Sequence, residues 1–443
     1  MGSSDEEGGR GRVTNDRGEG TTADRVPSGN VGRTMFWLTF GTLLYVAMQW
    51  ILTVVVFKVA GPEANGDYTL GLSSSSVAYA VVMFGMRPYQ ISDTRGEFAD
   101  NAYFASRVIT SVLAVAVALL TLPFTADFAR LWPLLVVFLL FRITEGWMDV
   151  FHGVLQKADR MDKAGIALIL RAVVEALVFA LLIGSTGSVF VAVSGMLGVS
   201  LISLLVLEWR WTRPYLDGIP LSRAGGWGRG FDLVRRCTPL LAANLAYSAV
   251  VFLSRNSVGE VWGTELLGFY GAISAPLLLV PLVVSSLYTP FMGHLAEYRL
   301  SGQPRRLLAL SAKLFGAILG LILVAFALLP FVGPPVLSLI FGPSVLAHMD
   351  LLAPVAASVS LTALVGFGNA VLTAVRRVEW TMIAAVVAVA LVLLVGNPLV
   401  VAYGANGASF ALIVGQGAQL MVTMVGFLVA LRSLRTVPET EGA

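Results

Sequence analysis

The sequence has almost none of the residues from which soluble enzymes and secreted scaffolds build their sites. It contains one cysteine, Cys237, which excludes a disulfide framework and a zinc-ribbon site. Its three histidines, His152, His294 and His348, lie far apart in the chain and suggest no metal cluster. A Walker-type phosphate loop is also missing, so we do not expect the chain to hydrolyse ATP. The sequence therefore predicts no metal, no cofactor and no nucleic-acid partner.

Charge is scarce as well, whereas apolar residues are abundant. Only 13% of the residues are charged and 56% are hydrophobic. Runs of about 20 apolar residues recur along the chain, which is the length that a helix needs to cross about 30 Å of hydrocarbon. These runs lack the strict alternation of barrel strands. The composition therefore predicts an all-α integral membrane protein.

We predict about twelve transmembrane helices in two parallel six-helix repeats. The first six are residues 35–57, 68–86, 103–124, 131–155, 164–183 and 189–207, and the second six are 233–253, 266–288, 307–331, 351–375, 380–401 and 409–431. Short signatures mark corresponding points, such as Gly66 to Tyr68 with Gly268 to Tyr270. An even number of spans leaves both repeats in one orientation, as in transporters whose pathway lies between two halves.

The composition also divides the chain into segments. They are a disordered cytoplasmic tail (1–33), the first bundle (34–208), a cytoplasmic linker (209–230), the second bundle (231–434) and a C-terminal tail (435–443). Residues 332–345 contain several glycines and prolines. We therefore expect this stretch to form a short interfacial or re-entrant element instead of part of a span.

The distribution of basic residues predicts the orientation. Of the 30 Lys and Arg residues, 23 fall on the side of the termini, and only Lys58, Arg130 and Arg255 fall on the other side. Loops rich in Lys and Arg stay in the cytoplasm. We therefore expect a multi-pass protein of the cytoplasmic membrane with both termini in the cytoplasm.

Four charged residues are predicted near the middle of the membrane. Arg142 and Glu145 lie in the fourth span, and Arg171 and Glu175 lie in the fifth. Because each helical residue advances by the same rise along the axis, counting from the ends of the spans places Arg142 level with Glu175 and Glu145 level with Arg171. We expect an ion-pair ladder between two antiparallel helices. It can be a structural lock, a switch or proton-coupling site, or, through Arg142, a ligand contact.

Asp149 and His152 follow on the fourth span, and the sequence offers no obvious partner for either.

Further polar residues within or at the ends of the spans suggest where cargo would bind. Gln49 lies in the first span, Asn244 and Tyr247 lie in the seventh, and Arg255 lies at the outer end of the seventh. The first and seventh spans are equivalent in the two repeats, so these residues can converge on a shared cavity. Taken singly, such residues more often bond neighbouring helices to each other.

Two basic residues occupy matching positions, Arg107 in the third span and Lys313 in the ninth. Long basic side chains near the ends of spans often reach the headgroups. The alternative is a basic cytoplasmic vestibule for an anionic lipid head.

Several short segments resemble a known family. They are 66–71, 151–156 leading into 160–162, 267–272, 341–343 and 403–408. In order and spacing they resemble bacterial polysaccharide-biosynthesis flippases, of the O-antigen-flippase type, over about residues 34–434. That family belongs to the multidrug/oligosaccharidyl-lipid/polysaccharide exporter superfamily, which also contains the MATE antiporters and the lipid II flippases.

The resemblance implies two V-shaped bundles and alternating access. It also implies a polyprenyl-pyrophosphate-linked oligosaccharide as cargo, moved from the inner to the outer leaflet for surface polysaccharide assembly. Membrane lipids and glycan-assembly proteins are the expected partners. Family members bind the pyrophosphate in a cationic cavity, whereas the predicted ladder leaves this chain no unpaired arginine cluster near the middle of the membrane.

Other functions stay open. A MATE-like antiporter driven by protons or sodium would need an acidic residue in the first or seventh span, where only Asp232 lies at one edge. A major-facilitator transporter would carry an Arg-rich loop after its second span, which residues 87–98 do not resemble. A membrane enzyme of glycan assembly would need external carboxylates around its substrates, and few are present. We therefore expect a transporter and not an enzyme.

Overall fold

The protein is described here by a computed structural model that covers residues 31–93, 97–216 and 226–435, and these residues form helices and no strand. Most of the predicted tails (1–30 and 436–443) and part of the linker (217–225) lie outside the described residues. By length and composition alone, nine helical stretches of the described chain could cross a membrane. The predicted all-α membrane architecture is confirmed.

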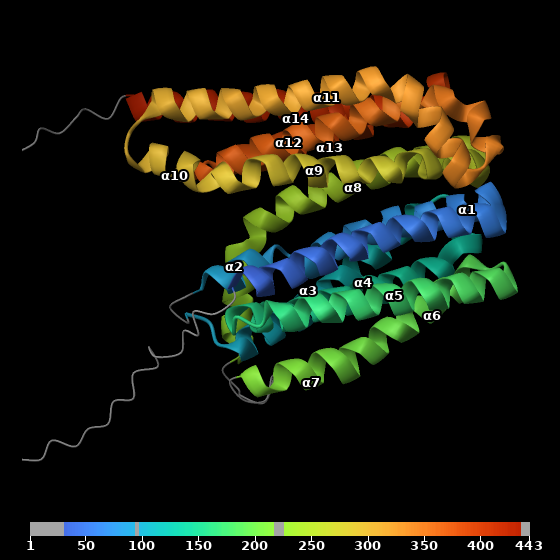
Figure 1. The fold of residues 1–443 in the computed structure, drawn as a ribbon, viewed down its shortest axis with the longest axis horizontal. Helices are drawn as coiled ribbons and strands as arrows, with labels where there is room; N and C mark the ends of the chain where they lie inside the picture. The colour runs from blue at the N-terminus through green and yellow to red at the C-terminus, as the bar shows by residue number, and fades with distance from the viewer. Residues whose placement is uncertain (1–30, 94–96, 217–225, 436–443) are drawn as a thin grey trace, which may run out of the picture.

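Figure 1 shows the chain as two helical bundles that lie side by side. The first bundle contains α1 (Val31–Met83), α2 (Met86–Ser92), α3 (Asp100–Thr121), the 3-10 turn η1 (Leu122–Phe124), α4 (Phe128–Lys157), α5 (Met161–Thr186), α6 (Val189–Ile202), the π-helical turn η2 (Ser203–Glu208), α7 (Trp209–Thr212) and η3 (Arg213–Tyr215). Within it, α1 packs against α5, α4 and α3.

The second bundle repeats this plan. It contains α8 (Gly226–Ser274), η4 (Pro276–Leu278), α9 (Leu279–Tyr288), η5 (Thr289–Phe291), α10 (Met292–Leu300), α11 (Pro304–Phe341), η6 (Pro343–Leu351), α12 (Leu352–Ala374), α13 (Val378–Tyr403) and α14 (Ala405–Arg435). Because α1 and α8 each consist of two helices joined at a sharp break, and α9 continues the second part of α8, the described chain makes twelve passes.

The breaks in α1 and α8 show how closely the two repeats match. They fall at Gly61 (φ 89°) and Gly263 (φ 81°), each shortly before the matching Gly66 and Gly268 signatures. Both glycines combine a positive φ with a ψ near 180°, a region that is essentially restricted to glycine. Further along, the equivalent helices α5 and α13 have the same length, 26 residues each.

The two bundles meet most tightly just after these breaks, at what we call the closed end. A Cβ atom on Gly66 would lie 1.8 Å from the carbonyl oxygen of Thr264, and one on Gly268 would lie 1.8 Å from that of Pro62. The two contacts are equivalent under exchange of the repeats. Asn65 adds a hydrogen bond, with its Nδ2 donating to the carbonyl of Gly268 at 2.7 Å. Only glycine allows the backbones to approach this closely.

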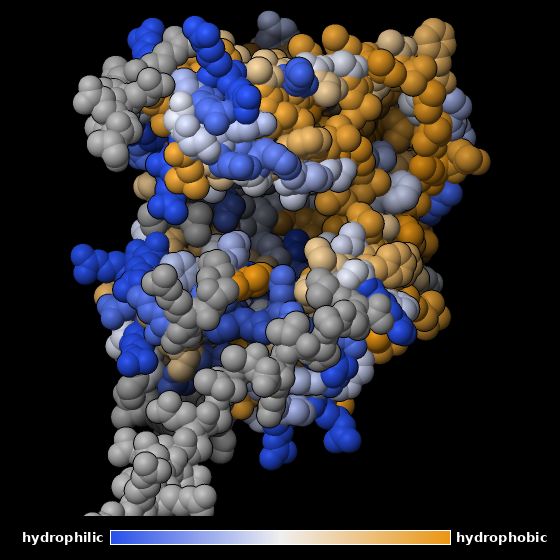
Figure 2. All heavy atoms as spheres, turned by 60° about the vertical axis from the view of Figure 1, so that its left-hand side comes forward, coloured by the Kyte–Doolittle hydropathy of each residue, from blue (hydrophilic) through white to orange (hydrophobic). Residues whose placement is uncertain are grey.

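At the opposite end, which we call the open end, the bundles separate. This end carries the first turn of α1 and the last turn of α14 (Figure 1). Figure 2, which turns this end toward the viewer, shows the molecule hollowed between the two bundles, with hydrophilic residues around the opening. The start of α8 is the exception, because Leu233 and Cys237 pack against Phe98 and Tyr103 of the first bundle.

One predicted element is wrong. Residues 332–345 do not form a separate interfacial or re-entrant segment, because α11 continues as one helix of 38 residues through Pro330, Pro334 and Pro335 to Phe341. Its counterpart α3 has 22 residues. Membrane helices tolerate proline where neighbouring groups satisfy the freed carbonyls. The extra residues of the second repeat therefore lengthen a helix.

Candidate functional site

A chain of alternating charges runs through the core of the first bundle. Nη1 of Arg142 lies 2.5 Å from Oε2 of Glu145, and Oε1 of Glu145 lies 3.2 Å from Nη2 of Arg171. Nε of Arg171 then lies 3.3 Å from Oε1 of Glu175. Arg142 is the most exposed of the four side chains, at 16%. The two positive and two negative charges cancel within this chain, which avoids burying net charge.

The chain differs from the expected ladder in one contact. Glu145 and Arg171 meet as expected, but Arg142 does not pair with Glu175. Arg171 reaches both carboxylates with different nitrogens, whereas Arg142 pairs within its own helix and lies over the ring of Tyr79 at 5.0 Å. Counting residues along the helices placed Glu145 beside Arg171, but it could not show which nitrogens of Arg171 would face which acid.

Two hydroxyl groups from other helices complete this cluster. Tyr45 of α1 donates a hydrogen bond to Glu145, and its ring lies 4.4 Å from the guanidinium of Arg171. Gln49 donates to the Tyr45 hydroxyl at 3.3 Å. Ser200 of α6 donates to Glu175. The cluster thus joins α1, α4, α5 and α6, and Gln49, expected to contact cargo, is tied into it.

A second charged cluster lies nearer the open end. Asp149 accepts hydrogen bonds from Arg87 at 3.0 Å and from Arg107 at 3.1 Å. Arg107 also donates to the carbonyl of Val82 and is 1% exposed. The expectation that Arg107 lines an open vestibule is therefore wrong, because its charge is buried and paired between α1, α3 and α4.

Lys313, its predicted equivalent, is exposed on α11.

His152 also has a partner that the sequence did not suggest. Its Nε2 lies 2.9 Å from Oε1 of Glu208, and both side chains are buried. Glu208 ends the π-helical turn η2, which follows α6 directly.

The second bundle contributes a polar face on α8. One face of this helix touches the first bundle at Cys237 and again at Gly259, where a Cβ atom would lie 3.1 Å from Ala126. By helical periodicity, Asn244 and Arg255 lie on the same face between these two contacts. Asn244 is exposed and Arg255 is partly exposed. The face is therefore less closely covered at Asn244 than at Cys237 and Gly259, and Asn256, next to Arg255, hydrogen-bonds Phe124 and Ala126 of the first bundle.

Arg255 is the unusual member of this face. The phenols of Tyr270 and Tyr247 lie near its guanidinium, and it has no ion-pair partner within the described part of the chain. It lies about two helical turns before the break at Gly263, which is about 12 Å along the helix. The seventh span was expected to end near Leu253, whereas the helix continues past Arg255 to Gly263. Tyr247 is 43% exposed.

Several members of these clusters were missed from the sequence, namely Tyr45, Arg87, Ser200 and Glu208. One signal was present. Asp149 and His152 were left without partners, and buried charges need them. A search for those partners would have suggested Arg87 and Glu208, each of which lies at the end of a predicted span.

Comparisons with known proteins place the fold. The sequence matches no protein-family model and no curated protein with which it was compared. The structure resembles an inward-facing multidrug resistance MATE family transporter of the MOP superfamily, with a TM-score of 0.64 and 14% identity over 92% of this chain and 100% of that one. An outward-facing MATE transporter of the same superfamily gives a TM-score of 0.56 at 15% identity, covering 93% and 96%.

A MOP superfamily transporter from Pyrococcus furiosus, whose binding pocket is described as having reversed polarity, gives a TM-score of 0.58 at 16% identity, covering 93% of this chain and 96% of that one. At such low identities these matches establish the fold alone. The chain thus has the fold of the MATE transporters of the MOP superfamily, as the sequence resemblance implied, while the flippase branch is not established.

Proposed function

We propose that the protein is a membrane transporter that works by alternating access between its two bundles. The closed end is sealed by the equivalent contacts of Gly66 and Gly268, and the hollow opens at the other end (Figure 2). The same fold is known in both inward-facing and outward-facing forms. A rocking motion about the middle of the molecule would open one end as it closes the other.

We propose that its cargo is an anionic lipid-linked oligosaccharide carried on polyprenyl pyrophosphate. The observation that carries this proposal is Arg255, a partly exposed cation on the face of α8 that also bears Asn244, without an acidic partner among the described residues. In contrast, the deep carboxylates that the structure describes are each within 3.3 Å of a basic group; they are Glu145, Asp149, Glu175 and Glu208. An unpaired cation in a low-dielectric site favours an anion.

The surrounding residues fit the parts of such a cargo. Arg255 would bind the pyrophosphate, while Asn244 and Tyr247 would hydrogen-bond the sugars from the same helix. Lys313 would attract the anionic head at the open end. The polyprenyl chain would stay in the bilayer. Arg107 has no part in this scheme, because its charge is already paired.

The direct test is flipping by purified protein in proteoliposomes that contain a fluorescent lipid-linked oligosaccharide. Arg255→Gln should reduce the flipping rate at least about 10-fold, since a charge-assisted hydrogen bond contributes about 1.5–3 kcal/mol. Arg235→Gln, at an exposed position near the start of the same helix, is the matched control. Flipping that is unaffected by Arg255→Gln would remove the cationic site from the mechanism.

A MATE-like antiporter of small molecules is the second candidate, and the fold itself favours it. The same vesicles can be loaded with an organic cation and given a proton or sodium gradient. Gradient-driven efflux without flipping of the lipid-linked sugar would select the antiporter. New covalent products from the lipid-linked sugar would instead select a membrane enzyme of glycan assembly.

We also propose that the open end faces the cytoplasm of a cell whose cytoplasmic membrane holds the protein. The support is the excess of Lys and Arg at the end that carries the described chain ends. In a Cys237→Ala background, an impermeant thiol reagent added to whole cells should label Arg130→Cys but not Arg305→Cys. Labelling of Arg305→Cys from outside would reverse the orientation.

A further inference from the structure

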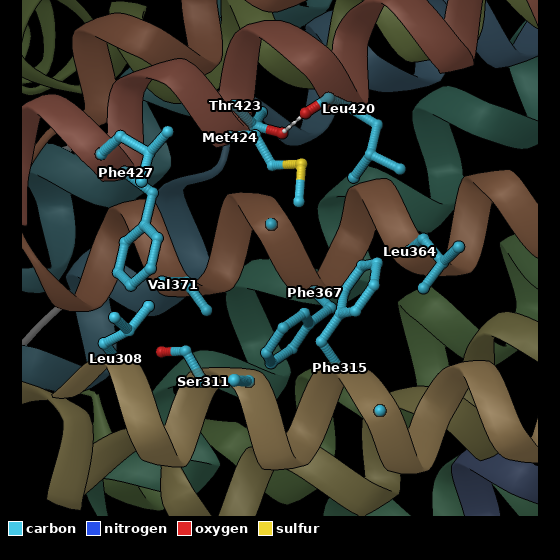
Figure 3. Close-up of a pocket in the computed structure, with 14 residues that line it drawn as sticks. Leu308, Ser311, Phe315, Leu364, Phe367, Val371, Leu420, Thr423, Met424 and Phe427 are labelled. Atoms are coloured by element: carbon cyan, nitrogen blue, oxygen red, sulfur yellow. Dashed lines mark hydrogen bonds between the residues drawn. The ribbon is translucent and has the colours of Figure 1, made fainter. Parts of the chain in front are cut away.

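The second bundle contains an apolar cavity that the transport scheme does not use. It has a volume of about 300 Å³ and lies between α11, α12 and α14. Figure 3 shows its walls, with Leu308 and Phe315 on α11, Phe367 on α12, and Met424 and Phe427 on α14. Because Leu308 is 39% and Met424 is 52% exposed, the cavity opens to the outside of the bundle.

One polar group in the cavity wall has no partner. The Oγ atom of Ser311 is buried and makes no hydrogen bond with any described residue. The other hydroxyl, on Thr423, donates to the carbonyl of Leu420 at 2.8 Å (Figure 3). A ligand with a hydrogen-bond acceptor at this level would satisfy Ser311.

A basic pocket of about 170 Å³ lies further along the same helices, toward the open end. Its walls include Arg299, Arg376 and Arg377, together with Val375 and Ser433. The cavity and the pocket lie on the same helices, since Val371 of the cavity is one turn from Val375, and Phe427 is one to two turns from Ser433. The apolar cavity and the cationic pocket therefore lie within one to two helical turns of each other.

The arginines of this pocket are only weakly neutralised. Arg377 lies 3.3 Å from Glu379 and donates to Ser433 at 3.3 Å. Neither Arg299 nor Arg376 has an ion-pair partner in the ranges that the structure covers. The helix α13 begins here, so its first backbone N–H groups add positive potential at the same place.

The first repeat contains the equivalent turn with different residues. Asp159 (φ 55°) and Arg376 (φ 54°) occupy equivalent positions and the same left-handed conformation, which suits Asp far better than Arg. Arg160, equivalent to Arg377, forms two hydrogen bonds of 3.0 Å with Asp162 and one with Tyr215. The second repeat therefore keeps an arginine in a disfavoured conformation and leaves its pocket open, which points to a bound anion.

We propose that this combined site binds one anionic phospholipid of the surrounding leaflet. The phosphate would sit among Arg299, Arg376 and Arg377, one acyl chain would fill the cavity, and an ester carbonyl would accept a hydrogen bond from Ser311. Basic pockets between transmembrane helices bind anionic lipid headgroups in this way. The site lies inside the second bundle, so it is separate from the cargo face on α8.

The test uses the delipidated full-length protein in detergent and native mass spectrometry. We expect one phosphatidylglycerol to bind per protein, with phosphatidylcholine binding much more weakly and inorganic phosphate failing to compete. Arg376→Asp introduces the residue found at the equivalent position of the first repeat and changes the local charge by two units. Because each unit of charge near a lipid headgroup changes binding about 5-fold, this substitution should weaken phosphatidylglycerol binding roughly 30-fold. Arg305→Asp, exposed at the same end but outside the pocket, should leave it unchanged.

The acyl chain is tested separately. Gly316 lines the cavity and has open space beside its Cα, so Gly316→Leu should fill the cavity without a clash and weaken binding. Gly320→Leu is the matched control, since Gly320 lies one turn further on α11, also with open space, and does not line the cavity.

Equal binding of phosphatidylglycerol and phosphatidylcholine, or unchanged binding in Arg376→Asp, would overturn the proposal. Full competition by inorganic phosphate with no effect of Gly316→Leu would also overturn it, by assigning the pocket to free phosphate. None of these outcomes bears on the proposed cargo.

Discussion

The two bundles share a backbone plan but differ in the chemistry of their cores. Between α4 and α5 of the first bundle lie Arg142, Glu145, Arg171 and Glu175. When α5 is aligned with α13, which has the same length, the equivalent positions in the second bundle hold Val359, Thr362, Ala388 and Val392. There, Ala388 and Val392 pack against Val250 of α8.

Because the two bundles have the same helix arrangement, this difference shows that the fold requires neither the buried ion pairs nor the apolar residues at these positions. The same helix arrangement is held in one repeat by a neutral chain of buried ion pairs and in the other by apolar packing. Buried pairs are directional, so they fix helices in one arrangement, whereas apolar contacts allow cavities such as the one in Figure 3. We infer that the first bundle is the more rigid half and the second the more adaptable.

The largest expected effect is at Glu145, the centre of the ion-pair chain. Glu145→Ala removes the partner of Arg142 and one of the two partners of Arg171, and it should destabilise the protein by about 3–5 kcal/mol, because it leaves one uncompensated positive charge in the core. A thermal-shift assay in detergent measures this. Thr362→Ala, at the equivalent position of the second bundle, should cost no more than about 1 kcal/mol. Equal losses would end the distinction between the bundles.

The second prediction asks whether the first bundle tolerates the chemistry of the second. Arg171→Ala alone strands Glu175 and should cost about 3 kcal/mol or more, whereas Arg171→Ala with Glu175→Val leaves the neutral pair of Arg142 and Glu145 and should recover most of that loss. The same thermal-shift assay compares the two. If the double variant is no more stable than the single one, Arg171 and Glu175 do not act as a pair.

Transport by the recovered double variant separates two roles of the chain. A structural lock restores transport together with stability. A switch or proton-coupling site leaves a stable protein that does not transport.

The third prediction concerns the contact between the bundles. Gly66→Ala places a methyl group against the backbone of Thr264 and should destabilise the closed end by about 1–3 kcal/mol, as overpacking does. Spin labels at Lys58 and Glu265, one on each bundle, should then report longer distances. Gly268→Ala should have the same effect, because the two contacts are equivalent. Gly184→Ala, which meets open space, is the control.

The smallest expected effect is at Asp93, which hydrogen-bonds the backbone of Glu97 and Phe98 close to the start of α8. Partial burial alone would raise the pKa of Asp93, but hydrogen bonds from the backbone N–H groups of Phe98 and Glu97 outweigh it and hold the pKa below its ordinary value. Phe98 in turn packs against Leu233 and Cys237.

Asp93→Asn should therefore cost about 1 kcal/mol at neutral pH. Because the folded-state pKa is lowered, this contribution is complete above the ordinary value of about 3.9 and is lost as the pH falls below it through the folded value. Stability curves of the two proteins should converge on acidification. Curves that stay parallel down to low pH would show that the charge of the Asp93 carboxylate does not contribute to stability.

Much of the architecture could be predicted from the sequence. Apolar run lengths gave the twelve passes, and signatures such as Gly66 and Gly268 gave the repeat, because both are local properties of the chain. The helix through Pro334 and Pro335 could not be predicted. Proline disfavours a helix locally, and only packing against neighbouring helices reverses that preference.

The site was predicted only in part, for a related reason. The sequence determined that Arg142, Glu145, Arg171 and Glu175 lie at similar depth, because the rise of a helix is constant. The directions and lengths of side chains on separate helices decided which of these residues form pairs. They also decided that Asp149 neutralises Arg107.

The sequence by itself thus determined a membrane protein of two parallel repeats, since hydrophobic length and repetition are written along the chain. Only the tertiary structure decided which charges remain free. It cancelled those of the first bundle against one another, left Arg255 without an acidic partner among the described residues, and placed arginines one to two helical turns from an apolar cavity at the end of the second bundle. Charge pairing depends on distances between helices, and these are set only when the helices pack.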